Sequence, residues 1–247
     1  MAARIRSGSS RRPDPAGAAI GAYYSITAVI RKRLEEVEAR MEKALRTAGR
    51  KREEITLVAV TKTFPASVIR DAYECGLRHF GENYVQEFEA KAPELADLSG
   101  ATFHFVGHLQ SNKARRAAEL FQVIQTVDSA RLARRLQETG RPVEVMLEVK
   151  LSPEESKSGA SPEELPALIE ALRSMPNLRL TGLMTMPPWS ENPEDSRPYF
   201  RRLRALAQQH GLQALSMGMS HDFEVAIEEG ATHVRIGSAL FGPRTKA

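Results

Sequence analysis

The chain has 247 residues, a length typical of a single (β/α)8 barrel, and a formal net charge of +4 at pH 7. Arginines outnumber acidic residues in its first 24 positions, so much of the excess charge lies there and does not indicate a nucleic-acid partner. No apolar stretch is long enough to cross a bilayer. The single cysteine cannot form an internal disulfide, which fits a reducing compartment such as the cytoplasm.

Residues 1–24 are rich in Gly, Ser, Pro, Ala and Arg and lack a periodic apolar pattern, so we predict a disordered N-terminal extension. A targeting peptide is the less favoured alternative, because prolines interrupt this segment and its Ala-Gly part is only weakly hydrophobic. From Ile26 to Leu45 apolar residues recur at helical spacing, which predicts a helix before the first strand. One domain is expected to follow the extension, over residues 25–247.

Short runs of apolar and β-branched residues then alternate with amphipathic helical patterns. The predicted strands cover residues 57–62, 79–83, 103–107, 123–127, 143–149, 178–186, 214–217 and 233–237. A doubly wound open sheet would show the same alternation, but eight units in a domain of this size favour closure into an α/β TIM barrel. This topology by itself indicates no function.

The first predicted strand ends abruptly on Lys62, and Pro65 opens the next helical pattern. Lys62 should therefore lie at the carboxyl ends of the parallel strands, where α/β proteins place their chemistry. A lysine that enters a partly dry pocket has its charged form disfavoured, which makes it a candidate Schiff-base nucleophile. The alternative, a solvated lysine at a strand end, is the favoured interpretation when the strand is considered alone.

The loops after the seventh and eighth strands carry the sequences Ser216-Met217-Gly218-Met219-Ser220 and Gly237-Ser238. These two loops form the usual phosphate site of a TIM barrel. Gly218 would let the backbone approach an anion closely, the serines offer hydroxyl donors, and a helix beginning near His221 directs N–H groups at the same place. An ordinary strand-to-helix turn is the alternative, but the pairing of the two loops favours a phosphate site.

Six motifs in order resemble the YggS/PROSC family of pyridoxal phosphate homeostasis proteins, from the first helix to Arg244. The motifs are Lys62, residues 80–87, residues 104–113, Lys157-Ser158-Gly159, residues 215–220 and residues 234–238. The family resembles the barrel domain of alanine racemase without that enzyme's second, β-rich domain. Its members hold pyridoxal 5′-phosphate on the lysine of the first strand and have no firmly assigned reaction.

The resemblance implies a cofactor site in which Lys62 forms a Schiff base with pyridoxal 5′-phosphate. The implied cofactor-binding residues are Lys62, Asn83, Ser216, Met217, Gly218, Met219, Ser220, Arg235, Gly237 and Ser238. Arg235 would face the pyridine nitrogen and disfavour its protonation, which makes the ring a poorer electron sink. An ion pair of Arg235 with Glu82 or Glu148 is a compatible alternative, and a structural hydrogen bond is the alternative for Asn83.

Three further residues belong to these motifs or lie beside them. We expect His104 to be a core residue and Lys157 to be an exposed loop lysine, although in the family Lys157 is implicated in transiently receiving the cofactor. His221 departs from the family pattern, which has an acidic residue there, and it adds a titratable group beside the phosphate site.

We therefore expect a protein that takes part in vitamin B6 homeostasis by buffering pyridoxal phosphate or delivering it to pyridoxal phosphate-dependent apo-enzymes. A racemase-like enzyme that uses the same cofactor is the rival hypothesis, and a phosphate-binding barrel enzyme without this cofactor is the third. We assign no catalytic residue and expect no metal. The expected chain is a cytoplasmic monomer that binds neither nucleic acid nor a membrane.

Overall fold

Eight parallel strands close into a barrel in chain order, and β1 pairs with β8. The computed structural model describes residues 15–152 and 158–243, with side chains from Ile26 onward. The strands are β1 (Thr56–Val60), β2 (His79–Glu82), β3 (Thr102–Phe105), β4 (Val123–Val127), β5 (Val143–Glu148), β6 (Leu178–Met184), β7 (Ala214–Met219) and β8 (His233–Ile236). The predicted closed barrel and each of its predicted strands are confirmed.

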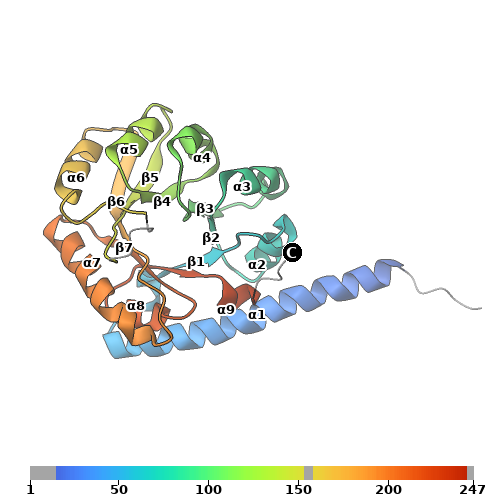
Figure 1. Cartoon of the computed structure of the whole chain (residues 1–247). Helices are drawn as coiled ribbons and strands as arrows, with labels where there is room; N and C mark the ends of the chain where they lie inside the picture. The colour runs from blue at the N-terminus through green and yellow to red at the C-terminus, as the bar shows by residue number, and fades with distance from the viewer. Residues whose placement is uncertain (1–14, 153–157, 244–247) are drawn as a thin grey trace, which may run out of the picture.

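Helices surround the barrel and follow its strands in turn (Figure 1). They are α2 (Ala66–Glu74), α3 (Val85–Lys91), α4 (Ala114–Leu120), α5 (Ala130–Gln137), α6 (Leu165–Arg173), α7 (Arg197–Gln209), α8 (Phe223–Glu228) and α9 (Ser238–Phe241). Short 3-10 turns cover η1 (Arg52–Glu54), η2 (Ala92–Leu95), η3 (Ser111–Lys113) and η4 (Pro193–Ser196). The sequence pattern did not predict α9, because a helix of 4 residues is too short to show a helical period.

Helix α1 (Pro15–Ala48) lies across the outside of the barrel and packs against α2, α8 and α9 (Figure 1). It begins ahead of Ile26, where the apolar repeat starts. The Ala-rich segment before Ile26 has no repeat that would reveal a helix, yet Ala is the strongest helix former and Pro is tolerated in a first turn. The rest of the predicted extension, residues 1–14, lies outside the described residues, and the domain boundary at residue 24 stays a prediction.

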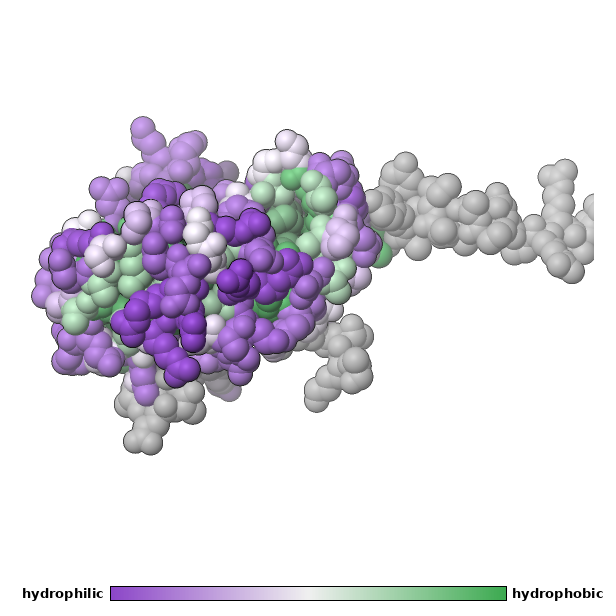
Figure 2. Space-filling view, turned by 90° about the horizontal axis from the view of Figure 1, so that it is seen from above, coloured by the Kyte–Doolittle hydropathy of each residue, from purple (hydrophilic) through white to green (hydrophobic). Residues whose placement is uncertain are grey.

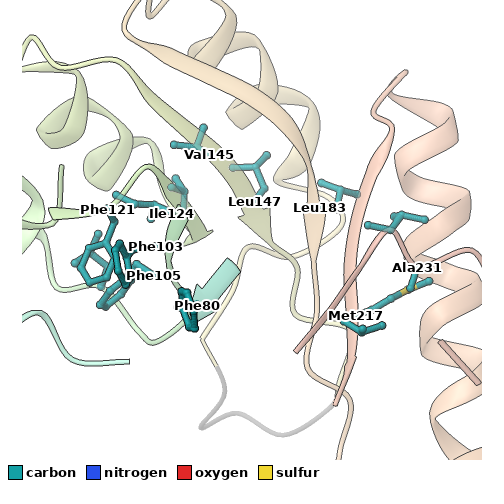
Figure 3. Packing of buried hydrophobic residues seen from close by; sticks show 14 of the residues in the cluster. Phe80, Phe103, Phe105, Phe121, Ile124, Val145, Leu147, Leu183, Met217 and Ala231 are labelled. Atoms are coloured by element: carbon teal, nitrogen blue, oxygen red, sulfur yellow. The ribbon is translucent and has the colours of Figure 1, made fainter. Parts of the chain in front are cut away.

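The apolar core lies between the strands and the surrounding helices (Figure 3). Aromatic rings pack closely there: the ring centroids of Phe80 and Phe103 are 5.7 Å apart, and those of Phe105 and Phe121 are 5.2 Å apart. The barrel interior is different, because it buries polar side chains such as Gln125. Polar groups are therefore held inside the ring of strands.

Hydrophilic residues cover most of the face shown in Figure 2. Within the described part of the chain, no helix combines the length and the apolar character that a membrane crossing requires.

Candidate functional site

A cavity of about 420 Å³ lies at the carboxyl ends of the barrel strands, a volume in the usual range for small-molecule sites. We call it the first cavity. Its lining residues come from the ends of strands far apart in the sequence: Val60, Lys62, Phe64, Asn83, Val106, Met186, Trp189, Met219, Ser220, His221, Arg235, Gly237, Ser238 and Gly242. Seven of the ten predicted cofactor-binding residues contribute to its wall, whereas Ser216, Met217 and Gly218 do not.

A tight turn holds Lys62 just beyond the end of β1. The N–H of Phe64 donates to the carbonyl of Thr61 at 3.1 Å, and Thr63 between them has a φ of 68°. This left-handed conformation is unusual for a residue other than glycine and costs about 1–3 kcal/mol. The carboxylate of Glu87 offsets part of that cost by accepting the Thr63 N–H at 2.6 Å. The turn directs Lys62 to the cavity wall.

A buried ion pair contacts the residue that precedes this turn. Glu82 is fully buried and accepts the hydroxyl of Thr61 at 2.8 Å and the ammonium of Lys91 at 3.2 Å. Burial raises the pKa of Glu82, while Lys91 and Thr61 oppose that rise. Lys91 also pairs with Glu87 at 2.5 Å. The strand end that carries Lys62 is thus joined to β2 and α3.

Backbone N–H groups converge on one hydroxyl where the loops after β7 and β8 meet. The oxygen of Ser220 accepts the N–H groups of Gly237 and Ala239, each at 3.2 Å. Ser238 lies between these two donors and lines the first cavity. Two N–H groups directed at a single point can also receive an anionic oxygen. The structure therefore brings Ser220, Gly237 and Ser238 together, as the phosphate hypothesis requires.

Residues 217–219, in the middle of the predicted phosphate loop, make contacts within the protein. Gly218 has a φ of 89°, and a Cβ at this position would lie 2.5 Å from the Cβ of Ala226, so close packing of β7 on α8 explains the glycine. The N–H of Met219 donates to the carboxylate of Asp222 at 2.7 Å. Met217 is fully buried in the core.

Arg235 lies on β8 beneath the first cavity and is almost fully buried. Its guanidinium donates to the hydroxyl of Ser216 at 2.6 Å and to the carbonyl of Thr185 at 3.0 Å. Burial lowers its pKa to about 10. Within the described residues it forms an ion pair with neither Glu82 nor Glu148. Ser216, which was predicted to bind phosphate, accepts a hydrogen bond from Arg235 in this structure, and its phosphate role stays a prediction.

A hydrogen-bonded chain continues from Ser216 across the barrel interior. The Ser216 hydroxyl donates to the Gln125 amide oxygen at 2.6 Å, and the Gln125 nitrogen donates to His104 Nδ1 at 3.0 Å. His104 Nε2 lies 3.0 Å from Nδ1 of His79. Burial lowers the pKa of His104 well below its usual range, so His104 is a neutral core residue, as the sequence predicted. Gln125 was missed, although a glutamine within an otherwise apolar strand was a usable signal.

A second cavity of about 380 Å³ adjoins the first, and Met186, Trp189 and Met219 line both. Glu148 contributes to the wall of the second cavity only. The Trp189 ring lies 6.4 Å from the ring of His221, at an interplanar angle of 27°. The sequence analysis did not single out Trp189, which follows two prolines in the loop after β6. Lys157 lies outside the described residues.

The chain matches the family described as alanine racemase, N-terminal domain, over residues 33–245. The fold and the site thus define a barrel of the alanine racemase type. The chain is 49% identical to the pyridoxal phosphate homeostasis protein of Pseudomonas aeruginosa, over 87% of this chain and 96% of that protein. It is 46% identical to the protein of the same name from Aquifex aeolicus, over 86% and 97%. The chain belongs to the family of pyridoxal phosphate homeostasis proteins, as its sequence motifs predicted.

Solved structures agree with this assignment. PipY of Synechococcus elongatus, determined with PLP bound, is 40% identical and has a TM-score of 0.74, with 86% of this chain and 100% of PipY covered. Alanine racemase from Corynebacterium glutamicum has a TM-score of 0.65, over 88% of this chain and 61% of that chain, and at 23% identity it shows the fold alone.

Proposed function

We propose that the chain binds pyridoxal 5′-phosphate in the first cavity, as a Schiff base with Lys62, and that it buffers or delivers this cofactor. The observation that carries the proposal is the meeting of a lysine, a pair of convergent backbone N–H groups and a buried arginine at one cavity. Relatives named for pyridoxal phosphate homeostasis, and the PLP-bound structure of PipY, support it.

The residues present fit the chemical groups of this cofactor. The hydroxyls of Ser220 and Ser238 and the N–H groups of Gly237 and Ala239 are suited to a phosphate, because charge-assisted hydrogen bonds are about twice as strong as neutral ones. The amine of Lys62 would condense with the cofactor aldehyde, forming one C=N bond and releasing water. Asn83 lines the same wall and would contact the ring edge.

The surroundings of Arg235 favour a carrier over an enzyme. The cofactor would supply an electron sink only as far as its pyridine nitrogen is protonated. A guanidinium held by Ser216 and Thr185 is a permanent donor to that nitrogen and opposes protonation. We propose further that the cofactor passes to apo-enzymes that depend on it, and that the protein acts as a monomer in the cytoplasm.

Replacement of the lysine tests the proposal. We expect Lys62→Ala to abolish the visible absorbance of covalently bound pyridoxal, and with it the product that borohydride reduction fixes to the chain. The fold should persist by circular dichroism, because Lys62 lies in a turn outside β1. Lys32→Ala, at an exposed position of α1, is the matched control and should keep the absorbance. Full absorbance in Lys62→Ala would exclude the assigned Schiff base.

A further inference from the structure

We propose that the second cavity binds a small molecule that carries a primary ammonium group on an apolar body, and that the carboxylate of Glu148 receives the ammonium. The cavity stands beside the proposed cofactor site but is not part of it, and Glu148 lines it from the end of β5.

Glu148 is a buried carboxylate with one oxygen that lacks a hydrogen-bond partner among the described residues. Only 3% of the residue is exposed, and Oε2 has no hydrogen-bond partner in the part of the chain that the structure describes. An ionised carboxylate without a partner is costly to bury, so its presence in a cavity wall points to a ligand that carries donors. Burial, followed by the nearby charge of Asp128, raises the pKa of Glu148 to about 7, which is the behaviour of a carboxyl group short of a cation.

The positive side chains of the described barrel interior are engaged elsewhere. Arg235, whose charge reaches Glu148, donates to the Ser216 hydroxyl and the Thr185 carbonyl rather than to Glu148. Lys91 pairs with Glu82 and Glu87. Lys150 lines the same cavity, but it makes no hydrogen bond to Oε2 of Glu148 among the described residues. A cation on a molecule that enters the cavity would satisfy Glu148.

The apolar part of the cavity wall indicates the body of that molecule, although His108, Lys150, Ser152 and Ser158 also line the cavity. Met186, Trp189 and Met219 are three of the six exposed large hydrophobic residues among those described, and all three line this cavity. Their gathering at one place indicates an apolar ligand surface. A metal ion is not the expected occupant, because the described residues contain no group of three side chains suited to hold one. An ammonium on a hydrocarbon body matches both the acid and the apolar wall.

The single tryptophan of the chain lines the cavity and provides the measurement. We would titrate the protein, with pyridoxal phosphate bound, with n-pentylamine and with its neutral counterpart 1-pentanol, and follow Trp189 fluorescence. The amine should give a saturable change and should bind more tightly than the alcohol. Glu148→Gln should weaken the amine about 10- to 100-fold, the range for a charged hydrogen bond, and leave the alcohol unchanged. Glu144→Gln, on the same strand, is the matched control and should change neither.

Two further arms complete the test. In Lys62→Ala the affinity for n-pentylamine should persist, so that failure of the cofactor proposal and failure of the amine proposal give different results. L-Norleucine, which adds a carboxylate to the same amine, distinguishes amino acids from simple amines. Binding of either ligand supports the proposal if Glu148→Gln weakens that binding. Equal affinity for amine and alcohol, or an unchanged amine affinity in Glu148→Gln, would overturn it.

Discussion

At the scale of single residues, two buried glutamates on the barrel show how partners decide the state of a carboxyl group. Glu82 has a hydroxyl and an ammonium within hydrogen-bond distance, whereas Oε2 of Glu148 has no such partner among the described residues. Burial raises the pKa of both; Lys91 and Thr61 oppose the rise for Glu82, and the pKa of Glu148 rises to about 7. The two residues therefore differ in how much the burial of an ionised carboxylate destabilises the folded state at neutral pH.

The stability of the protein should depend on pH through Glu148. Its pKa rises from an ordinary 4.5 to about 7 on folding, so between these values the folded state binds more protons than the unfolded state. The free energy of unfolding then falls as the pH rises from about 4.5 to 7. Glu148→Gln cannot ionise, so its free energy of unfolding should not fall in this pH range. At pH 8 the variant should exceed wild type by up to about 3 kcal/mol, because each unit of pKa shift corresponds to about 1.4 kcal/mol. Urea unfolding at pH 5 and pH 8 measures the difference.

The matched control for this prediction is Glu144→Gln, at the other end of β5, which should keep the wild-type pH dependence. An advantage of Glu148→Gln that is equal at both pH values would contradict the assigned titration.

Two serines of the predicted phosphate site should behave differently from one another. Ser238→Ala removes a donor from the cavity wall and should weaken pyridoxal phosphate by about 1–3 kcal/mol, measured by equilibrium dialysis. Ser216→Ala leaves Arg235 and Gln125 each one hydrogen bond short, so it should change the absorption spectrum of the bound cofactor as well as its affinity. Unchanged binding in both variants would place the phosphate elsewhere.

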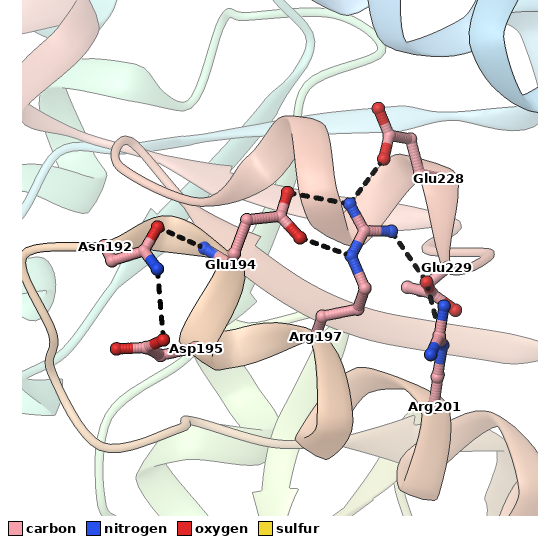
Figure 4. A network of polar contacts seen from close by, with 7 residues as sticks. All are labelled: Asn192, Glu194, Asp195, Arg197, Arg201, Glu228 and Glu229. Carbon is pink, nitrogen blue, oxygen red and sulfur yellow. Dashed lines mark hydrogen bonds and ion pairs between the residues drawn. The ribbon is translucent and has the colours of Figure 1, made fainter.

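At the scale of elements, ion pairs join the segment after β6 to the helix after β7 (Figure 4). Arg197, at the start of α7, donates to Glu194 at 2.6 Å, Glu228 at 2.7 Å and Glu229 at 2.7 Å. These three carboxylates raise the pKa of Arg197. Arg201 adds a further bond to Glu229 at 3.1 Å. One arginine thus links η4, α7 and α8.

A buried aspartate extends this link to the loop after β7. Asp222 accepts the hydroxyl of Ser196 at 2.8 Å and the N–H of Met219 at 2.7 Å. Since Met219 adjoins Ser220, the order of η4 and α8 is coupled to the backbone that forms the proposed phosphate site.

Loss of Arg197 should therefore cost more than loss of an ordinary surface arginine. Arg197→Met leaves three carboxylates without their shared cation, and we expect a loss of about 1–3 kcal/mol in the free energy of unfolding. Arg135→Met, which removes a single exposed pair with Glu138, should cost less than about 0.5 kcal/mol. Thermal unfolding of both variants measures the contrast, and equal losses would show that the network adds nothing.

At the scale of the whole molecule, the barrel brings Lys62 and Arg235 to the wall of one cavity. We expect the cofactor-loaded protein to reactivate a pyridoxal phosphate-dependent apo-enzyme and to racemise L-alanine far more slowly than about 1 per second, the low end of ordinary enzyme rates. A coupled assay for D-alanine, run beside the reactivation assay, measures both. Turnover at enzyme rates that disappears in Lys62→Ala would refute the carrier proposal.

The order of strands and helices and the places of Lys62, Ser220 and Ser238 could be predicted from the sequence. The spacing of apolar residues is a local property of the sequence. A parallel barrel brings the carboxyl ends of all its strands to one face, whatever the side-chain packing inside it. The family could be recognised for a similar reason, because its motifs are short and contiguous. The alternatives for Arg235 could not be resolved in this way, since they depend on which side chains meet inside the barrel.

Only the tertiary structure decided how the interior groups pair. Ser216 and Gln125 are separated by 91 positions, and they meet because β7 and β4 are strands of the same closed barrel and both side chains are buried inside it. The register shift between β7 and β8 decides which residues lie opposite Arg235. The unpartnered Oε2 of Glu148 and the shared wall of Met186, Trp189 and Met219 likewise come from contacts between distant segments. Local sequence specifies periods and turns, whereas the pairing of buried polar groups depends on non-local packing.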